Sequence, residues 1–372
     1  MKYFIILILS SLFLLFKFCG FSKNIYFSSS RELNENIINV KNHGVRGDGI
    51  SDDWASIQKL IDSLANNDGG ILFFPEGRYI VKDKTLLLWG KNITILGEPK
   101  NKTIFEKQGS AGWWGELLTI SGKASGGKYY GSFGKTDYNR FVIYDGVNEP
   151  SKNITINNIF FTTNSAEISS KANNVAIFNS NGVIIKNCVF SNAPQTNLAI
   201  VNNTLKSYNK WVIVSDCIFQ DSGNHNVRVI SYNQGKYLGN QVYIKNSIFK
   251  TVLNSDKSLE LKDEKVHLWY RAGQGSDNIS LTVENCKFDK TGKIRSTVNA
   301  SNFKLKSSIV VNKVELLGHK NYLAGEIELI NNIFFDEVFI ANKNTLVFKN
   351  NSQNNKEYKR PKIFRVNNLK DK

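Results

Sequence analysis

Two basic side chains, Arg228 and His267, are the strongest candidates for chemistry in this chain. Side chains alternate along a strand, so the apolar positions of four similar segments predict an outward column of Ala176, Ala199, Arg228 and His267. Arg228 and His267 would then lie about 5 Å apart on neighbouring strands. The cation would keep the imidazole neutral and basic, and could itself hold a carboxylate. A base beside a carboxylate-binding cation predicts β-elimination at a uronate.

Other side chains extend this candidate site. His225, in the turn before Arg228, is a second candidate base, and a second outward column contains Phe178, Val201, Ile230 and Trp269. An aromatic ring can stack on a sugar, and cations can hold its carboxylates. The candidates for substrate binding are therefore Arg271, Trp269, Lys245 and Trp113. The alternative is structural: Arg228 as a solvated strand residue, His267 as a partner of Glu264, and Trp269 as packing under a loop.

Hydrolysis is the second reaction that the sequence leaves open. It needs two carboxylates roughly 5 to 10 Å apart across the bond. The outward column has none, but acidic residues in the flanking loops could lean over it: Asp221, Asp256, Glu260, Asp263 and Asp277. No carboxylate cluster has convincing Ca²⁺ spacing, so no metal ligand is predicted, although Ca²⁺ stays a possible cofactor assembled by loops. A carbohydrate-binding or surface-attachment protein without turnover is the third possibility.

The elements that position these residues contain a short sequence motif that occurs six times. It ends at Phe161, Phe190, Phe219, Phe249, Phe288 and Phe335, which gives intervals of 29, 29, 30, 39 and 47 residues. A short period that later stretches predicts a stacked solenoid with loop insertions. The insertions expected are Leu253 to Lys265, Gly292 to Ser307, and the aromatic segment from Gln108 to Pro150 that contains Trp113.

Each unit joins two β-branched segments through one Asn or Asp, a residue that tolerates left-handed backbone angles. We expect these residues to stack as a polar ladder at a tight bend: Asn158, Asn187, Asp216, Asn246, Asn285 and Asn332. About 29 residues per turn accommodate three short strands, as in a parallel β-helix. Cys188, Cys217 and Cys286 directly follow ladder residues, so we predict stacked core thiols rather than metal ligands.

The segment before the repeats reads "GVRGDGISDDWASIQKLID", followed by "GGILFFPEGRYIV". Trp54, Ile57, Leu60, Ile61 and Leu64 keep a helical period after a cap at Ser51 or Asp52, and this helix is expected to plug the open end of the coil. The spacing closely resembles the amino-terminal signature of the pectate lyase superfamily, the group with rhamnogalacturonase-type and epimerase-like members.

The resemblance implies a right-handed parallel β-helix that usually acts on polysaccharide. It does not select a reaction, because the scaffold hosts lyases, hydrolases, epimerases and inactive binders. We interpret the acidic residues of the signature, Asp48, Asp52 and Asp53, as turn and cap residues. The NTD, DD, GHG and RIK motifs of polygalacturonases are missing, which argues against that activity.

The predicted organisation has four parts. Residues 1–22 form a signal peptide or lipoprotein signal, 37–97 the cap and first coil, 98–350 the all-β helix with its insertions, and 351–372 a basic tail. An uncleaved anchor that attaches the chain to a membrane is the alternative for the first part. The predicted location is secreted, cell-surface or periplasmic.

The charge balance indicates the partner. The chain has 48 Lys and Arg against 32 Asp and Glu, a net charge of +16. A basic exported protein attracts a polyanion, and acidic polysaccharide is the one that fits best. Nucleic acid is the competing polyanion, but no nucleic-acid motif is present and export would separate the chain from it.

Overall fold

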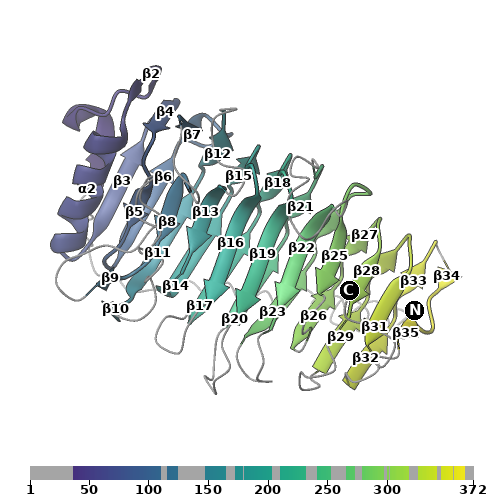
Figure 1. Cartoon of the computed structure of the whole chain (residues 1–372). Helices are drawn as coiled ribbons and strands as arrows, with labels where there is room; N and C mark the ends of the chain where they lie inside the picture. Colours follow the sequence, from purple (N-terminus) through teal and green to yellow (C-terminus); the bar gives the residue numbers. More distant parts are fainter. Residues whose placement is uncertain are drawn as a thin grey trace, which may run out of the picture. The chain divides into compact units, whose positions relative to one another are not determined.

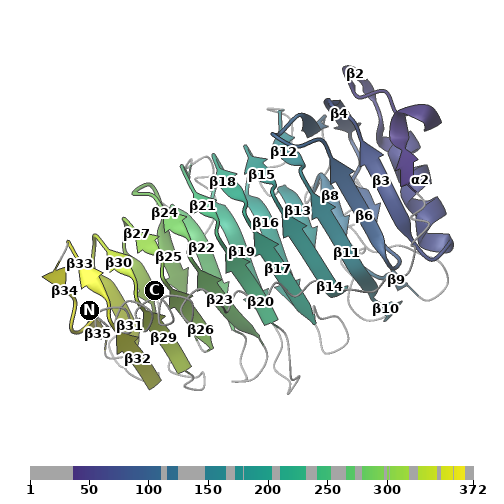
Figure 2. The ribbon, with the colours of Figure 1, turned by 180° about the vertical axis from the view of Figure 1, so that it is seen from behind.

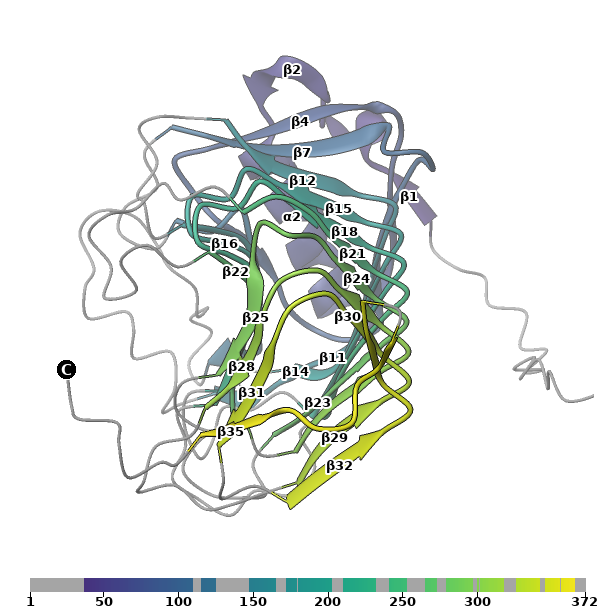
Figure 3. The ribbon, with the colours of Figure 1, turned by 90° about the vertical axis from the view of Figure 1, so that its right-hand side faces the viewer.

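Three parallel sheets stack along the described part of the chain, and one short α-helix lies near its start (Figure 1). This computed structural model describes residues 37–109, 115–124, 147–164, 172–178, 180–202, 210–231, 241–252, 265–272, 279–296, 300, 302–317, 326–341, 345–354 and 356–364. Viewed along the stack, the sheets form the sides of each coil (Figure 3). Figure 2 shows the same strands from behind. The predicted right-handed parallel β-helix is confirmed.

Sheet A lies directly before the bend where the Asn ladder was expected. Its neighbouring strands pair in parallel with steady register, so that one core residue per coil lies on the next, as with Ile156, Ile185, Val214 and Ile244. Its strands are β1 (Ile37–Asn39), β3 (Gly70–Phe74), β6 (Ile93–Gly97), β11 (Ser151–Asn157), β14 (Ser180–Lys186), β17 (Trp211–Ser215), β20 (Gln241–Lys245), β23 (Ser280–Glu284), β26 (Phe303–Lys306), β29 (Glu326–Ile330) and β32 (Thr345–Lys349).

Sheet B contains the repeated phenylalanines. The rings of Phe161, Phe190, Phe219, Phe249 and Phe288 stack on one another with centroid distances of 5.1, 4.9, 5.1 and 4.3 Å. Its strands are β2 (Asp48–Asp52), β4 (Gly77–Lys82), β7 (Thr103–Gln108), β12 (Phe160–Thr163), β15 (Val189–Ser191), β18 (Ile218–Gln220), β21 (Ile248–Phe249), β24 (Lys287–Phe288), β27 (Ile309–Val310), β30 (Ile333–Phe334), β33 (Ser352–Gln353) and the antiparallel β34 (Lys356–Glu357).

Sheet C carries the candidate site. Its strands are β5 (Leu86–Leu88), β8 (Leu118–Ile120), β13 (Asn173–Ile177), β16 (Thr196–Asn202), β19 (His225–Ser231), β22 (Val266–Arg271), β25 (Lys293–Ser296), β28 (Val314–Leu316), β31 (Val338–Ala341) and β35 (Lys362–Phe364). The short strands β9 (Lys123–Ala124) and β10 (Val147–Glu149) form a separate antiparallel pair.

The helix predicted near the N-terminus is present, but its N-cap is Asp53 rather than the expected Ser51 or Asp52. A 3₁₀ helix, η1 (Val40–His43), precedes α2 (Trp54–Asn66), which contacts the early strands β3, β4 and β5. Asp53 is the N-cap by position, but its carboxylate accepts from the backbone N–H groups of Arg46 and Gly47 rather than from the helix. Asp48 and Asp52 also accept backbone N–H groups of this segment, as expected of turn and cap residues.

The polar ladder predicted at the bend from sheet A to sheet B is present, but one of its six residues differs from the prediction. The left-handed positions include Asn158, Asn187, Asp216, Asn246 and Asn285, and amide bonds connect Asn246 to Asp216 at 3.2 Å and Asn285 to Asn246 at 2.9 Å. In the last predicted unit, however, the left-handed residue is Asn331, and Asn332 is buried one position later. The prediction that Asn332 is the ladder residue is therefore wrong by one position.

The hexapeptide INNIFF occurs twice in the chain, and its two copies take different registers in the coil. At 156–161 the second Asn takes the left-handed angle and the last Phe is buried, whereas at 330–335 the first Asn does so and Phe334 is buried. Phe335 is 44% exposed. The buried site after the ladder holds Cys188, Cys217 and Cys286 in other coils, which confirms the stacked thiols.

One predicted insertion is instead a whole coil. The segment from Gly292 to Ser307 contains β25 and β26, which pair in regular parallel register with their neighbours. The 47-residue interval thus spans two short coils, with Val310 of β27 in the place where a Phe was expected. Strands also continue past residue 350, in the segment expected to be a tail. Residues 253–264 of the other late insertion lie outside the described part.

Candidate functional site

The outward side of sheet C forms a column that differs from the predicted one. Ala176, Ala199 and Arg228 pair as expected, but the residue beside Arg228 is Trp269. The next residue is Arg295, followed by Glu315. These alternate with core side chains such as Val227 and Leu268, so they face away from the core. We call the column Thr119, Ala176, Ala199, Arg228, Trp269, Arg295 and Glu315 the sheet C face.

His267 lies outside this face, because the prediction misaligned its strand by two residues. β22 pairs Val266 with His225, which places His267 opposite Asn226 at the bend from sheet B to sheet C. The side chain of His267 is 0% exposed, contrary to the expectation that it faces solvent. Gly292 packs so closely that a Cβ there would lie 3.1 Å from the imidazole Cδ2. Arg228 is also buried, with 8% of its surface exposed.

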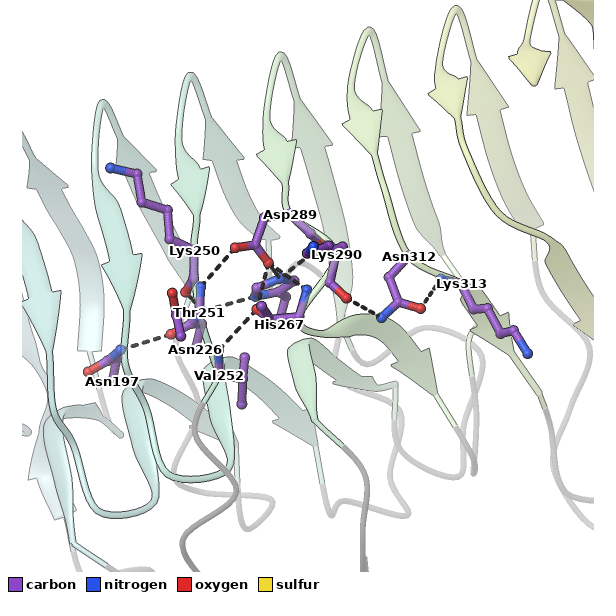
Figure 4. Close-up of polar contacts among 11 residues, drawn as sticks. Asn197, Asn226, Lys250, Thr251, Val252, His267, Asp289, Lys290, Asn312 and Lys313 are labelled. Atoms are coloured by element: carbon purple, nitrogen blue, oxygen red, sulfur yellow. Dashed lines mark hydrogen bonds and ion pairs between the residues drawn. The ribbon is translucent and has the colours of Figure 1, made fainter. Parts of the chain in front are cut away.

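At this bend His267 continues a second amide ladder that sequence reasoning missed (Figure 4). The Nδ2 groups of Asn174 and Asn197 donate to the Oδ1 atoms of Asn197 and Asn226 at 2.8 and 2.9 Å, and Asn226 Nδ2 lies 2.9 Å from His267 Nδ1. Each of these amides also donates to a backbone carbonyl, that of Asn226 to Lys250. The common position of three Asn two residues before Ala176, Ala199 and Arg228 was the available signal.

These contacts fix the tautomer of His267. Asn226 Nδ2 donates, so His267 Nδ1 must accept, and the ring proton is on Nε2, 2.9 Å from Asp289 Oδ1. Asp289 also accepts from the N–H of Thr251 and from Thr291. Partial burial would raise the pKa of Asp289, but the bonds from His267, Thr291 and Thr251 hold it below its usual range. Every polar ring atom of His267 is satisfied, as in a structural residue.

His225 has a different environment. It is 1% exposed, its ring stacks on that of Trp269 with centroids 5.0 Å apart and 17° between planes, and Nδ1 lies 3.4 Å from Thr196 Oγ1. Nε2 has no hydrogen-bond partner among the described residues. Burial, and then the charges of Arg228 and Arg295, lower the pKa of His225 well below its usual range. His225 is therefore a neutral imidazole beside two cations, the pairing that had been expected of His267.

Arg295 and Lys293 are site residues that sequence reasoning missed, because their segment was interpreted as a loop. Lys293 Nζ lies 3.0 Å from Glu315 Oε2, and Arg295 Nε lies 3.8 Å from the same oxygen. All three side chains are between 15 and 18% exposed. Burial lowers the pKa of Arg295, while Glu315 opposes that shift. The alternation in "KIRS" was the signal available.

Buried polar atoms without a hydrogen-bond partner gather on and beside the sheet C face. Native interiors rarely leave such atoms unpaired, so a cluster of them indicates a site for a polar ligand or water. Within the described part of the chain, the cluster comprises Thr119 Oγ1, Ser121 Oγ, Asn173 Oδ1, Gln195 Oε1, His225 Nε2 and Trp269 Nε1.

Comparison with known proteins identifies the family. Residues 37–315 match the family model described as rhamnogalacturonase A/epimerase, pectate lyase-like. The chain belongs to this family. A 181-residue segment, 44% of the chain, is 33% identical to plasmin and fibronectin-binding protein A of Streptococcus pneumoniae, and 104 residues, 27% of the chain, are 31% identical to mannuronan C5-epimerase AlgE1 of Azotobacter vinelandii. The segments span only 22% and 7% of those proteins.

Some solved protein structures are similar in fold to this β-helix. An alginate lyase from Paenibacillus sp. FPU-7 aligns with 83% of this chain and 95% of its own, at a TM-score of 0.49 and 11% identity. The S. pneumoniae surface adhesin PfbA aligns with 87% of this chain and 94% of its own, at a TM-score of 0.43 and 15% identity.

The remaining candidates of this pectate lyase-like chain are placed as follows. Arg271 pairs with Ile230 in the second outward column, next to the sheet C face, whereas Lys245 is exposed at the end of β20 in sheet A. Trp113 lies outside the described residues. Asp221 follows β18 and accepts from Ser191, and Asp256, Glu260, Asp263 and Asp277 lie outside the described part.

The described residues contain no group of three or more His, Cys, Asp or Glu that could hold a metal ion. No helix in the described ranges is long and apolar enough to cross a membrane. The predicted signal segment, residues 1–22, lies outside these ranges.

Proposed function

We propose that the sheet C face binds an acidic polysaccharide and that the chain is a polysaccharide lyase with His225 as its base. One observation carries this proposal: a buried imidazole, kept neutral, has no hydrogen-bond partner at Nε2 among the described residues and lies beside Arg228, Arg295 and the ring of Trp269. The net charge of +16 favours a polyanionic ligand. Family membership and the relatives named for mannuronan and alginate support a uronate-containing polymer.

The proposed reaction begins with the carboxylate of a uronate held by Arg228 and Arg295. Their charge stabilises the enolate-like electron density that develops when His225 Nε2 takes the proton from the carbon beside that carboxylate. The electron pair then forms a carbon–carbon double bond and expels the glycosidic oxygen, which takes a proton from the imidazolium or from water. Trp269 offers a surface for a sugar ring. His225 is buried in the free chain, so this face must open when the polymer enters.

Hydrolysis has less support from the described residues. Among the described residues, Glu116, just before β8, and Glu315 on β28 are carboxylates at this side of sheet C. Six strand steps of about 4.8 Å separate these strands, roughly 29 Å. A hydrolytic pair needs about 5 to 10 Å.

We also propose an extracellular location, in line with the predicted signal segment and the relative titled a surface adhesin.

A panel of polyuronates tests the reaction. Purified protein is incubated with pectate, rhamnogalacturonan, alginate and glycosaminoglycans, with and without Ca²⁺, and the ultraviolet absorbance of the new double bond is followed. A rise on one polymer supports the lyase and names its substrate. Reducing ends without that absorbance indicate a hydrolase, altered uronate stereochemistry without cleavage indicates an epimerase, and binding alone indicates a non-catalytic protein.

Matched variants test the residues. Arg228→Ala should lower turnover by at least about tenfold, because a guanidinium that holds a carboxylate contributes roughly 1.5 to 3 kcal/mol. Lys245→Ala is the control, since it removes a cation from sheet A in the next coil. Equal activity of the two variants would contradict the proposed site.

A further inference from the structure

The run of strands at the centre of sheet C is free of acidic residues. None of the five strands β13, β16, β19, β22 and β25 contains an Asp or Glu. Four steps of about 4.8 Å give this run a length of about 19 Å, enough for only a few sugar rings. A carboxylate lies at each end: Glu116 accepts from Asn173 at 3.3 Å, and Glu315 follows Arg295 in the next strand. The polar and cationic part of the face is thus bounded by negative charge.

Glu315 is the more exposed of these boundaries. Its two oxygens lie 3.1 and 3.0 Å from Lys293 Nζ, and it faces Arg295 across the strand pair. Its side chain is 17% exposed, whereas Glu116 is only 2% exposed. A carboxylate in this position balances the charge of one of the two cations, Lys293 and Arg295. It also repels any anion that approaches the next coil.

We infer that Glu315 ends the polysaccharide-binding part of the sheet C face and so limits the length of chain that the protein binds. This inference rests on the proposed function, since it concerns the same site. A uronate carboxylate is favourable beside Arg228 and Arg295, and unfavourable one coil later. Affinity for acidic oligosaccharides should therefore rise with length and then reach a plateau.

Titration of the full chain with size-fractionated oligosaccharides of the polymer that it binds tests this limit. Glu315→Gln keeps the shape of the side chain but removes its charge. We expect the plateau to move to longer oligosaccharides, with roughly two- to fivefold tighter binding of the longest ones. The affinity should also fall more steeply with salt concentration than in the unchanged protein.

Glu328→Gln is the matched control. Glu328 lies on sheet A, in the strand after β28, and pairs with Lys304 and Lys306 as Glu315 pairs with Lys293 and Arg295. If both variants keep the plateau of the unchanged protein, Glu315 does not end the polysaccharide-binding part of the face. Failure of the unchanged protein to bind any acidic oligosaccharide would overturn the proposed function itself and this inference with it.

A double variant covers the case in which Glu315→Gln unfolds. Glu315→Gln with Lys293→Gln removes both members of the ion pair and leaves no charge of that pair unbalanced. The carboxylate is still absent, so the plateau should again lie at longer oligosaccharides. An unchanged plateau in this folded variant would also contradict the inference.

Discussion

The bend that contains His267 and the face that contains His225 are both buried and polar, yet they differ in how their polar atoms are satisfied. His267 accepts from Asn226 and donates to Asp289, and the amides behind it are bonded on both sides. His225 Nε2 and Trp269 Nε1 have no partner among the described residues. A satisfied network contributes to the stability of the fold, whereas unsatisfied atoms are available to a ligand.

The two histidines therefore exchange the roles that their positions in the sequence suggest. His267 lies inside β22, where the register with β25 shifts between Val266 and Leu268, and it takes the place of an amide in a ladder. His225, which was expected in a turn, is instead the first residue of β19 and lies beside the aromatic and cationic side chains of the sheet C face. Substitutions at the bend should change stability most, and substitutions on the face should change activity most.

The largest expected effect is that of His267→Ala on stability. Removal of the ring opens a cavity beside the stacked rings of Phe249 and Phe288 and leaves Asn226 Nδ2 and Asp289 without their partner. We expect a loss of about 3 to 5 kcal/mol in the free energy of unfolding. Urea unfolding followed by circular dichroism measures it.

His267→Asn is the matched variant, because it restores the amide that occupies this position in the three preceding coils. It should recover part of the lost stability. If alanine and asparagine cost the same, or if both are neutral, the ladder does not stabilise this bend.

Activity should respond most strongly to His225→Gln. Glutamine can hydrogen-bond but cannot take up a proton near neutral pH, so turnover should fall by a factor of about 100 or more. Initial rates of double-bond formation on the substrate polymer measure this loss, with His267→Asn as the comparison. Retention of full activity in His225→Gln would remove His225 from the proposed mechanism.

The pH dependence of stability gives a smaller effect that needs no substrate. Burial and the nearby Arg228 and Arg295 lower the pKa of His225 in the folded protein, from an ordinary value of 6.5. Below about pH 6.5 the unfolded chain therefore binds a proton that the folded protein does not, and stability falls as pH falls.

His225 should contribute up to about 1.4 kcal/mol per pH unit between about pH 6.5 and pH 5. Urea unfolding of the unchanged protein and of His225→Gln across this range isolates that contribution. The variant should show the shallower slope. Identical slopes would mean that His225 does not stay neutral in the fold.

The sequence predicted the fold well because the fold depends on a pattern repeated many times. A Phe three residues after a left-handed Asn specifies one corner of each coil, and the helix after Asp53 specifies the cap. The errors occurred where one copy is ambiguous. INNIFF is compatible with two registers, and only its neighbours in the stack determine whether Phe334 or Phe335 enters the core.

The site was harder to predict because an outward column depends on register across several strands. Apolar residues at both Val266 and Leu268 allowed β22 to be aligned two residues away from its position, and this placed His267 beside Arg228. Burial of the face depends on the folded chain rather than on any local pattern. Arg228 and the environment of His225 therefore needed the structure, although the residues themselves could be named.

The smallest expected effect is that of Thr119→Val on the free energy of unfolding. Its sign distinguishes the sheet C face from the bend that contains His267. Thr119 pairs with Ala176 on the sheet C face, is 0% exposed, and its hydroxyl has no partner among the described residues. Valine has nearly the same shape and removes that unpaired hydroxyl, so unfolding should cost up to about 1 kcal/mol more. Asn197→Leu, the comparison at the bend, removes an amide that bonds on both sides and should destabilise by about 1 to 3 kcal/mol. Thermal unfolding of both variants measures the difference, and ligand titration should show weaker binding by Thr119→Val if its hydroxyl meets the sugar. A loss of stability in both variants would mean that the polar atoms of the face are structural like those of the bend.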